Sequence, residues 1–213
     1  MVKKYELLSD ETVIVRGRKL FRICASISFN NIEAGEKGGY IESEKNLAHE
    51  GDAWVSRNAQ VSGNAQVSGN AHVTDNAQVS GNAHVTDNAH VTGNARVSGN
   101  AQIDGEAWVF GETWVFGNAQ VSGNAKINSN AQINGDACVS SDTHYLCISP
   151  IGSRNDTITF TRTKEHKIAV AVGCFRGDID QFEARVKTTH GENEHAKAYM
   201  LAAQIARTRI DLS

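Results

Sequence analysis

The sequence GDAWVSRNAQVSGNAQVSGNAHVT, residues 51–74, opens an array of six-residue units that continues without a break to residue 140. The ninety residues of the array divide into fifteen units, and each places a small residue, nearly always alanine, two positions before a valine or isoleucine. Residues two apart in a strand share a side, so Ala59 and Val61 are predicted to face inward and Gln60 outward. Such short apolar faces are buried only when units stack, which predicts a solenoid.

The residues between the predicted strands suit tight corners. Most strands are followed by a pair such as Gly63-Asn64, and both residue types tolerate the positive φ angles that β-branched residues avoid. Gly and Asn in every unit would disrupt an amphipathic helix. The regular column of Ala and Val also argues for a buried core and against a disordered segment of low complexity.

The aliphatic residue of each unit is followed four positions later by a small one, as Val61 is by Ala65. This pattern resembles the left-handed parallel β-helix of hexapeptide-repeat proteins. The resemblance implies three units per triangular coil, and therefore about five coils of eighteen residues. At ~4.8 Å between stacked strands, the rod would be about 24 Å long.

The two flanking segments differ from the array because they are richer in charged residues. We expect a small N-terminal β cap (1–50), the β-helix (51–140) and a C-terminal α+β domain (141–213) in a mainly β chain. The cap is predicted to form a hairpin around Arg16-Gly17-Arg18 and to cover the open end of the β-helix. The C-terminal domain is predicted to contain strands and then two helices, the first with a capping box of Asp178 and Gln181.

Four aromatic residues interrupt the outward columns, where most units carry Gln or His. They are Trp108, Phe110, Trp114 and Phe116, all in the fourth coil. Exposed aromatic patches are typical of interfaces. Either these residues mediate self-association, for which a homotrimer is the first expectation since hexapeptide β-helices are commonly trimeric, or a terminal segment of the same chain covers them.

His72 and His90 lie one predicted coil apart in the same column. That spacing suits a shared metal ion or proton, but no carboxylate joins them in the column. We therefore interpret them as polar replacements of Gln, and predict no catalytic residue, no metal site and no cofactor. Hexapeptide acyltransferases place a catalytic His near a protruding loop, and the array contains no such loop.

Composition excludes several classes of protein. The formal net charge of −3 argues against general nucleic-acid binding. The four cysteines lack the spacing of a zinc site or a disulfide framework. The N-terminus does not resemble a signal peptide, and no segment approaches the ~18 apolar residues of a membrane span. We expect a soluble, cytoplasmic protein that does not bind membranes.

The candidate ligand site is the loop GSRND, residues 152–156. Its Arg154 offers a planar set of donors suited to phosphate or carboxylate. If the hairpin and first helix pack together, Cys174 can lie near the loop as well. The predicted site comprises Gly152, Ser153, Arg154, Thr159, Arg176 and His190. The alternative is that Arg154 pairs with Asp156 or a neighbouring acid and the loop is only a turn.

The whole chain, with GGYIE before the array and VGCFRGDIDQFEARVKTTHG after it, resembles phage- and prophage-encoded hexapeptide-repeat proteins of mostly unassigned function. The resemblance implies a bacterial or phage setting. We expect a non-enzymatic, oligomeric binding protein that sequesters a small anionic, nucleotide-like ligand of the host in an anti-defence role. The alternatives are a binder of a host protein, an acyltransferase that uses acyl-CoA, and a component of the virion.

Overall fold

Each six-residue unit forms one short strand in the computed structural model, which describes residues 3–213. The strands are two residues long and follow one another at intervals of six residues. They are β4 (Trp54–Val55), β5 (Gln60–Val61), β6 (Gln66–Val67), β7 (His72–Val73), β8 (Gln78–Val79), β9 (His84–Val85), β10 (His90–Val91), β11 (Arg96–Val97), β12 (Gln102–Ile103), β13 (Trp108–Val109), β14 (Trp114–Val115), β15 (Gln120–Val121), β16 (Lys126–Ile127), β17 (Gln132–Ile133) and β18 (Cys138–Val139).

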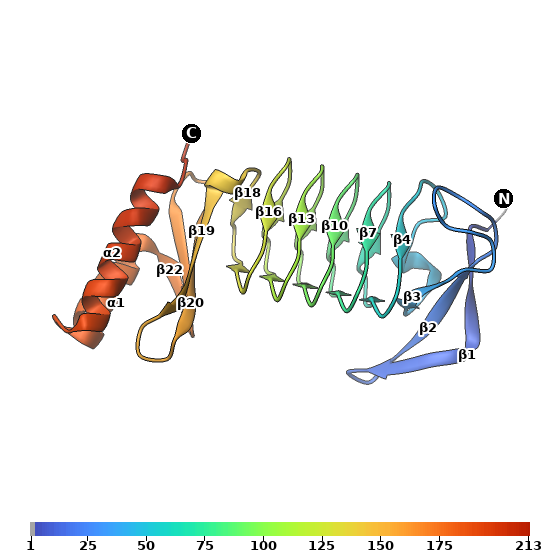
Figure 1. The fold of residues 1–213 in the computed structure, drawn as a ribbon, viewed down its shortest axis with the longest axis horizontal. Coiled ribbons are helices and arrows are strands. Elements are labelled where there is room, and N and C mark those ends of the chain that lie inside the picture. Colours follow the sequence, from blue (N-terminus) through green and yellow to red (C-terminus); the bar gives the residue numbers. More distant parts are fainter. Residues whose placement is uncertain (1–2) are drawn as a thin grey trace.

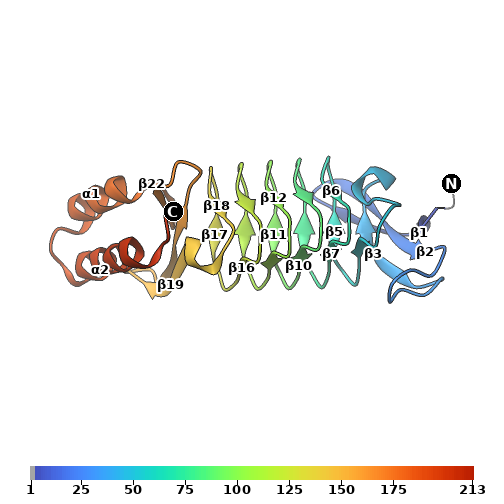
Figure 2. The ribbon, with the colours of Figure 1, turned by 90° about the horizontal axis from the view of Figure 1, so that it is seen from above.

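Strands eighteen residues apart pair in parallel, so the array winds into a β-solenoid with three faces (Figures 1 and 2). One face carries β5, β8, β11, β14 and β17, the second β4, β7, β10, β13 and β16, and the third β6, β9, β12, β15 and β18. Successive turns are joined by backbone hydrogen bonds, as where the Gln60 amide donates to the Ala77 carbonyl at 2.9 Å. The predicted inward residues, including Ala59 and Val61, are fully buried.

The corners explain the alternation of glycine and aspartate in the repeat. Gly63 has a φ of +69°, and Asp75 occupies the same kind of corner at +61°. The Asp75 carboxylate accepts hydrogen bonds from the Thr92 hydroxyl at 2.5 Å and the Gly93 amide at 3.2 Å. An aspartate therefore compensates for its less favourable backbone conformation by bonding to the next turn.

The N-terminal segment contains β1 (Tyr5–Val15), β2 (Arg18–Ala25), β3 (Lys37–Ile41) and the short 3-10 helix η1 (Glu44–Asn46). β1 and β2 form an antiparallel hairpin, and β3 pairs in parallel with β5. The parallel stack is therefore about six turns long. This is one turn more than the repeat predicts, because the sequence of β3 lacks the repeat and the strand could not be recognised from it. This segment also covers Trp54, which is 1% exposed and lies edge-on to Tyr5 and Phe29.

The C-terminal segment contains the 3-10 helix η2 (Asp142–His144), then β19 (Tyr145–Ile151), β20 (Asp156–Arg162), β21 (Ile168–Val172), β22 (Phe175–Asp178), α1 (Ile179–His190) and α2 (Glu194–Arg209). Its four strands form an antiparallel sheet. Both helices lie on the side of the sheet away from the solenoid (Figure 1). The predicted capping box of Asp178 and Gln181 is present at the start of α1.

The two faces of this sheet pack against different parts of the chain. Ile158 and Phe160 of β20 belong to a core shared with α1 and α2, whereas Thr159 between them faces the last turn of the solenoid. The prediction of a mainly β chain, with a parallel β-helix between an N-terminal β cap and a C-terminal α+β region, is confirmed. No helix within residues 3–213 is long and apolar enough to cross a membrane.

We expect Gly38→Ala to loosen the N-terminal cap, because a Cβ at this position would come within 2.5 Å of the Ile23 side chain and 2.7 Å of the Trp54 ring. Overpacking of this kind costs about 1–3 kcal/mol. Thermal unfolding and a red shift of the Trp54 emission, recorded with Trp108 and Trp114 replaced by Phe, measure the effect. Gly135→Ala is the control, since a Cβ there meets no atom within 4 Å and adds only backbone strain. The Trp54 emission distinguishes the two variants, and an unchanged emission in Gly38→Ala would contradict the expectation.

Candidate functional site

A depression of about 350 Å³ lies on the C-terminal unit, between the β19–β20 loop, the β21–β22 turn and the two helices. The predicted GSRND loop forms one wall of this depression, and α1 forms the other. Its polar and aromatic lining residues are Ser153, Arg154, Asp156, Cys174, Phe175, Phe182, Arg185, Thr189, His190 and Tyr199.

The loop lies close against α2, and Gly152 makes this approach feasible. Gly152 has a φ of +73°, and a Cβ there would come 1.9 Å from the Tyr199 phenol oxygen. Asn155 donates its amide to the Gly152 carbonyl at 3.3 Å, which closes the turn. The two residues inside the turn, Ser153 and Arg154, consequently stand at the rim of the depression.

Two arginines supply positive charge to the depression. Arg154 comes from the loop and Arg185 from the exposed side of α1. Within residues 3–213 neither guanidinium has a carboxylate within ion-pair distance, although Asp156 lines the same depression. The alternative in which Arg154 is only the partner of Asp156 is therefore not the arrangement found.

Aromatic rings form the floor of the depression. The Tyr199 ring packs edge-on to Phe182 at 5.7 Å between centroids, and the His190 ring lies 5.6 Å from Tyr199. The Tyr199 phenol can donate a hydrogen bond, and burial raises its pKa further above neutral. The depression thus combines flat apolar surfaces with cationic and hydroxyl donors.

The structure brings together Ser153, Arg154 and His190, and Gly152 lies in the same loop. It places Thr159 and Arg176 elsewhere. Thr159 is 1% exposed, and its hydroxyl accepts the Gln132 amide of the solenoid at 3.0 Å. The Arg176 guanidinium bonds to the Gln132 side chain and to the Gly173 carbonyl. Strand alternation is the reason, since the buried neighbours of Thr159 point toward the helices.

Reasoning from the sequence missed several lining residues, among them Arg185, Thr189 and Tyr199. Arg185 and Thr189 are four positions apart on α1, so helical periodicity places these two on one surface. Tyr199 comes from α2, and only the packing of the two helices brings it under the loop.

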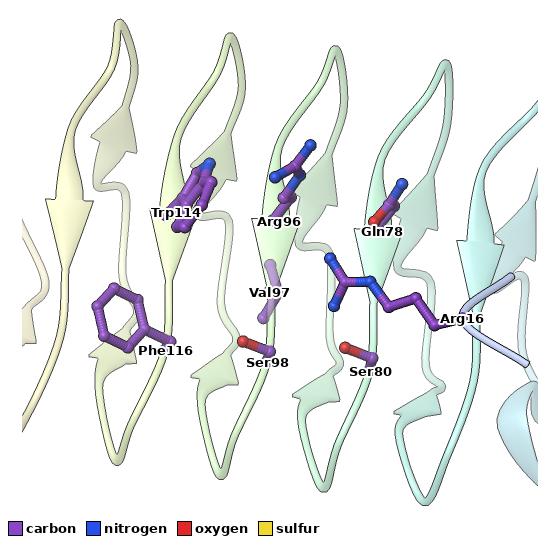
Figure 3. Close-up of a pocket in the computed structure, with 8 residues that line it drawn as sticks. All are labelled: Arg16, Gln78, Ser80, Arg96, Val97, Ser98, Trp114 and Phe116. Carbon is purple, nitrogen blue, oxygen red and sulfur yellow. The ribbon is translucent and has the colours of Figure 1, made fainter.

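A second hollow, of about 230 Å³, lies between the β1–β2 turn and the face that carries β8, β11 and β14 (Figure 3). We call it the hairpin groove. It is lined by Arg16, Gln78, Ser80, Arg96, Val97, Ser98, Trp114 and Phe116. Nothing in the sequence connects the hairpin turn to the repeat, so this groove was not predicted.

The aromatic residues of the fourth predicted coil lie on two faces. Trp108 is 42% exposed and Trp114 46%, so both indoles remain partly open to solvent. Phe110 and Phe116 are half-buried, and each lines a hollow together with residues of a flanking segment, Phe116 with Arg16 and Phe110 with Tyr145. Trp108 stacks on His90 at 4.4 Å with the rings nearly parallel, and His90 in turn lies 5.4 Å from His72. Among the described residues no cluster of three or more side chains suits a metal ion.

We expect Thr159→Val to destabilise the chain without changing the depression, because it leaves the part-buried Gln132 amide without its acceptor. A fully buried unsatisfied donor costs about 1–3 kcal/mol, and we expect a loss near the lower end of this range. Chemical denaturation measures the loss. The control is Thr157→Val on the same side of β20, whose hydroxyl bonds only to the exposed Ser149. A similar loss in both variants would show that the hydroxyl of Thr159 is not specifically required.

The comparisons with known proteins concern the solenoid alone. The model of the YdcK beta solenoid repeat family matches residues 59–74 and 77–93, which lie on strands β5 to β10. No curated protein matches the chain significantly. The array is therefore similar to the YdcK type of β-solenoid repeat.

Proposed function

We propose that this protein binds a small anionic ligand in the C-terminal depression and holds it without chemical change. The observation that carries the proposal is the presence of Arg154 and Arg185 on one depression, neither of them paired with a carboxylate within residues 3–213. Unpaired arginines at a concave surface are suited to phosphate or carboxylate, which they bind through two parallel hydrogen bonds.

The remaining lining residues favour a ligand that also carries a ring. Tyr199 and His190 offer flat surfaces, and Ser153 and Thr189 offer hydroxyl groups beside the two arginines. A nucleotide-like molecule combines such a ring with an anionic group. Asp156 at the same wall can accept a hydrogen bond from an amino or hydroxyl group of the ligand.

In this proposal the chain is a hexapeptide-type β-helix protein of phage or prophage origin, acting in the bacterial cytoplasm. Holding a nucleotide-like signal of the host would lower the free concentration of that signal, which is the anti-defence role in this proposal. The alternatives are that the C-terminal unit grips a host protein, or that the chain is an acyltransferase. Stabilisation of the protein by acetyl-CoA in a thermal melt would favour the acyltransferase.

Native mass spectrometry of the full chain purified from bacterial cells tests this function. We expect an added mass of nucleotide size that is lost in Arg154→Gln and in Arg185→Gln, because each substitution removes a charged donor worth about 1.5–3 kcal/mol. Lys187→Gln is the control, since this exposed lysine is also on α1 but does not line the depression. If all four proteins carry the same added mass, or if none does and mononucleotides fail to bind, the proposal is wrong.

We also propose that the chain forms a homo-oligomer, with a trimer as the expected state. The support is the exposed indole of Trp108, which lies flat on His90 and extends a continuous ring surface along one face of the rod. Phe110 follows on the same side of the strand and is half-buried. Such a surface is unusual among the polar outward positions of the repeat.

The double variant Trp108→Gln, Phe110→Ser restores the residues that other units carry, as at Gln60 and Ser62. We expect it to shift the protein to a smaller mass in native mass spectrometry, because it removes the apolar area that would be buried between copies. His84→Gln on the third face is the control. An unchanged mass would indicate that this surface is not the interface.

A further inference from the structure

The residue at the tip of the β1–β2 hairpin is unusual for its backbone conformation. Arg16 has a φ of +49° and Gly17 a φ of +78°, so both central residues of this two-residue turn are left-handed. Asn, Asp or Gly normally occupies the first of these positions. An arginine kept in a strained conformation is a reason to ask what its side chain does.

The hairpin is bent so that its tip overhangs the solenoid. The pairing of β1 with β2 shifts register between Leu8 and Thr12, and the bulged segment contains Glu11. The Glu11 carboxylate pairs with Lys37 and lies 3.8 Å from the Arg22 guanidinium, which anchors the bend to the neighbouring strands. The tip therefore lies beside β8, and the Arg16 side chain reaches over the face toward Arg96 (Figure 3).

The hairpin groove gathers positive charge without a compensating acid. Arg16 and Arg96 both line it, and none of its lining residues is Asp or Glu. Within the described part of the chain neither arginine has an ion-pair partner, whereas the nearby Arg18 is held by Glu42 at 2.9 and 3.0 Å. An anion that binds between two unpaired arginines is attracted by both.

An aromatic surface adjoins the two arginines. The Arg96 guanidinium lies 5.0 Å from the centre of the Trp114 ring, and Phe116 follows on the same side of the strand. Gln60, Gln78 and Gln132 occupy the same outward column on other turns. Arg96 and Trp114 are thus the positions where this column of the repeat does not carry Gln, and both residues line the hairpin groove.

We infer that the hairpin groove is a second binding site, and that its ligand is a small planar aromatic anion such as a mononucleotide. The phosphate or carboxylate would lie between Arg16 and Arg96, and the ring would pack on Trp114 and Phe116. The hydroxyls and amide of Ser80, Ser98 and Gln78 would complete the polar contacts. The volume of about 230 Å³ favours a small ligand.

Isothermal titration calorimetry on the full chain tests this site. The background protein carries Arg154→Gln and Arg185→Gln, so that the C-terminal depression lacks the arginines that would bind an anion. Adenosine 5′-monophosphate is the probe, compared with adenosine and with inorganic phosphate. We expect saturable binding of the monophosphate, tighter than that of either fragment and weakened by added salt. Because the background lacks the arginines of the depression, failure here does not bear on the proposed function.

The repeat and the turn provide variants that keep the fold. Arg96→Gln and Trp114→Gln restore the common residue of the column, and Arg16→Asn suits the left-handed turn position. We expect each to weaken binding by about ten-fold or more, since each removes a charged donor or the stacking surface. Lys19→Gln removes a neighbouring positive charge outside the groove and should leave the affinity unchanged.

Several outcomes would overturn the inference. It fails if the monophosphate does not bind saturably, or if Arg16→Asn and Arg96→Gln bind it as tightly as the background protein. It fails equally if adenosine or phosphate alone binds as well as the monophosphate, because then either the arginines or the rings are not used. Native mass spectrometry of every variant verifies that the assembly is the same, so that a loss of affinity reports on the groove.

Discussion

Backbone hydrogen bonds between strands eighteen residues apart hold the rod together. In each parallel pair the two strands donate to one another, and the Gln60 amide, for example, bonds to the Ala77 carbonyl of the next turn. The first and the last turn each lack a neighbour on one side, so each has backbone groups that no further turn can bond. Exposed strand edges recruit other chains, so each end needs a cap that supplies hydrogen-bonding partners.

Both caps meet this requirement with different groups. At the first turn the cap supplies donors: the buried Lys4 ammonium bonds to two carbonyls at 2.9 and 3.1 Å, and the Asn46 amide bonds to two more. Burial lowers the pKa of Lys4 to about 8, which is the cost of keeping a cation there. At the last turn the cap supplies acceptors, the Asp142 carboxylate for Lys126 and the Thr159 hydroxyl for Gln132.

The array could be predicted from the sequence, whereas the details of the two caps could not. The strands of the array follow from a period of six, because every unit repeats the same inward pair. The caps have no period. β3 reads KGGYI, and its glycines matter because Ile23 and Trp54 pack against Gly38, while the Ala59 carbonyl and the Val55 side chain lie against Gly39. The loop of the depression could be predicted from its chemistry, but Thr159 was misplaced there because the side of β20 that faces the helices depends on tertiary packing.

The outward side chains of a solenoid are largely free of folding constraints, and this makes departures from the repeat informative. The Gln120 side chain bonds to Gln102 on the preceding turn at 3.1 Å, as expected for a polar ladder that stabilises the rod. Arg96 and Trp114 replace such residues on the neighbouring face, and the backbone holds their strands in direct register. Side chains fixed at the strand spacing of ~4.8 Å lose little freedom when a ligand binds. A rigid rod can thus present a preorganised surface without any loop of its own, and the hairpin supplies the one wall that the rod lacks.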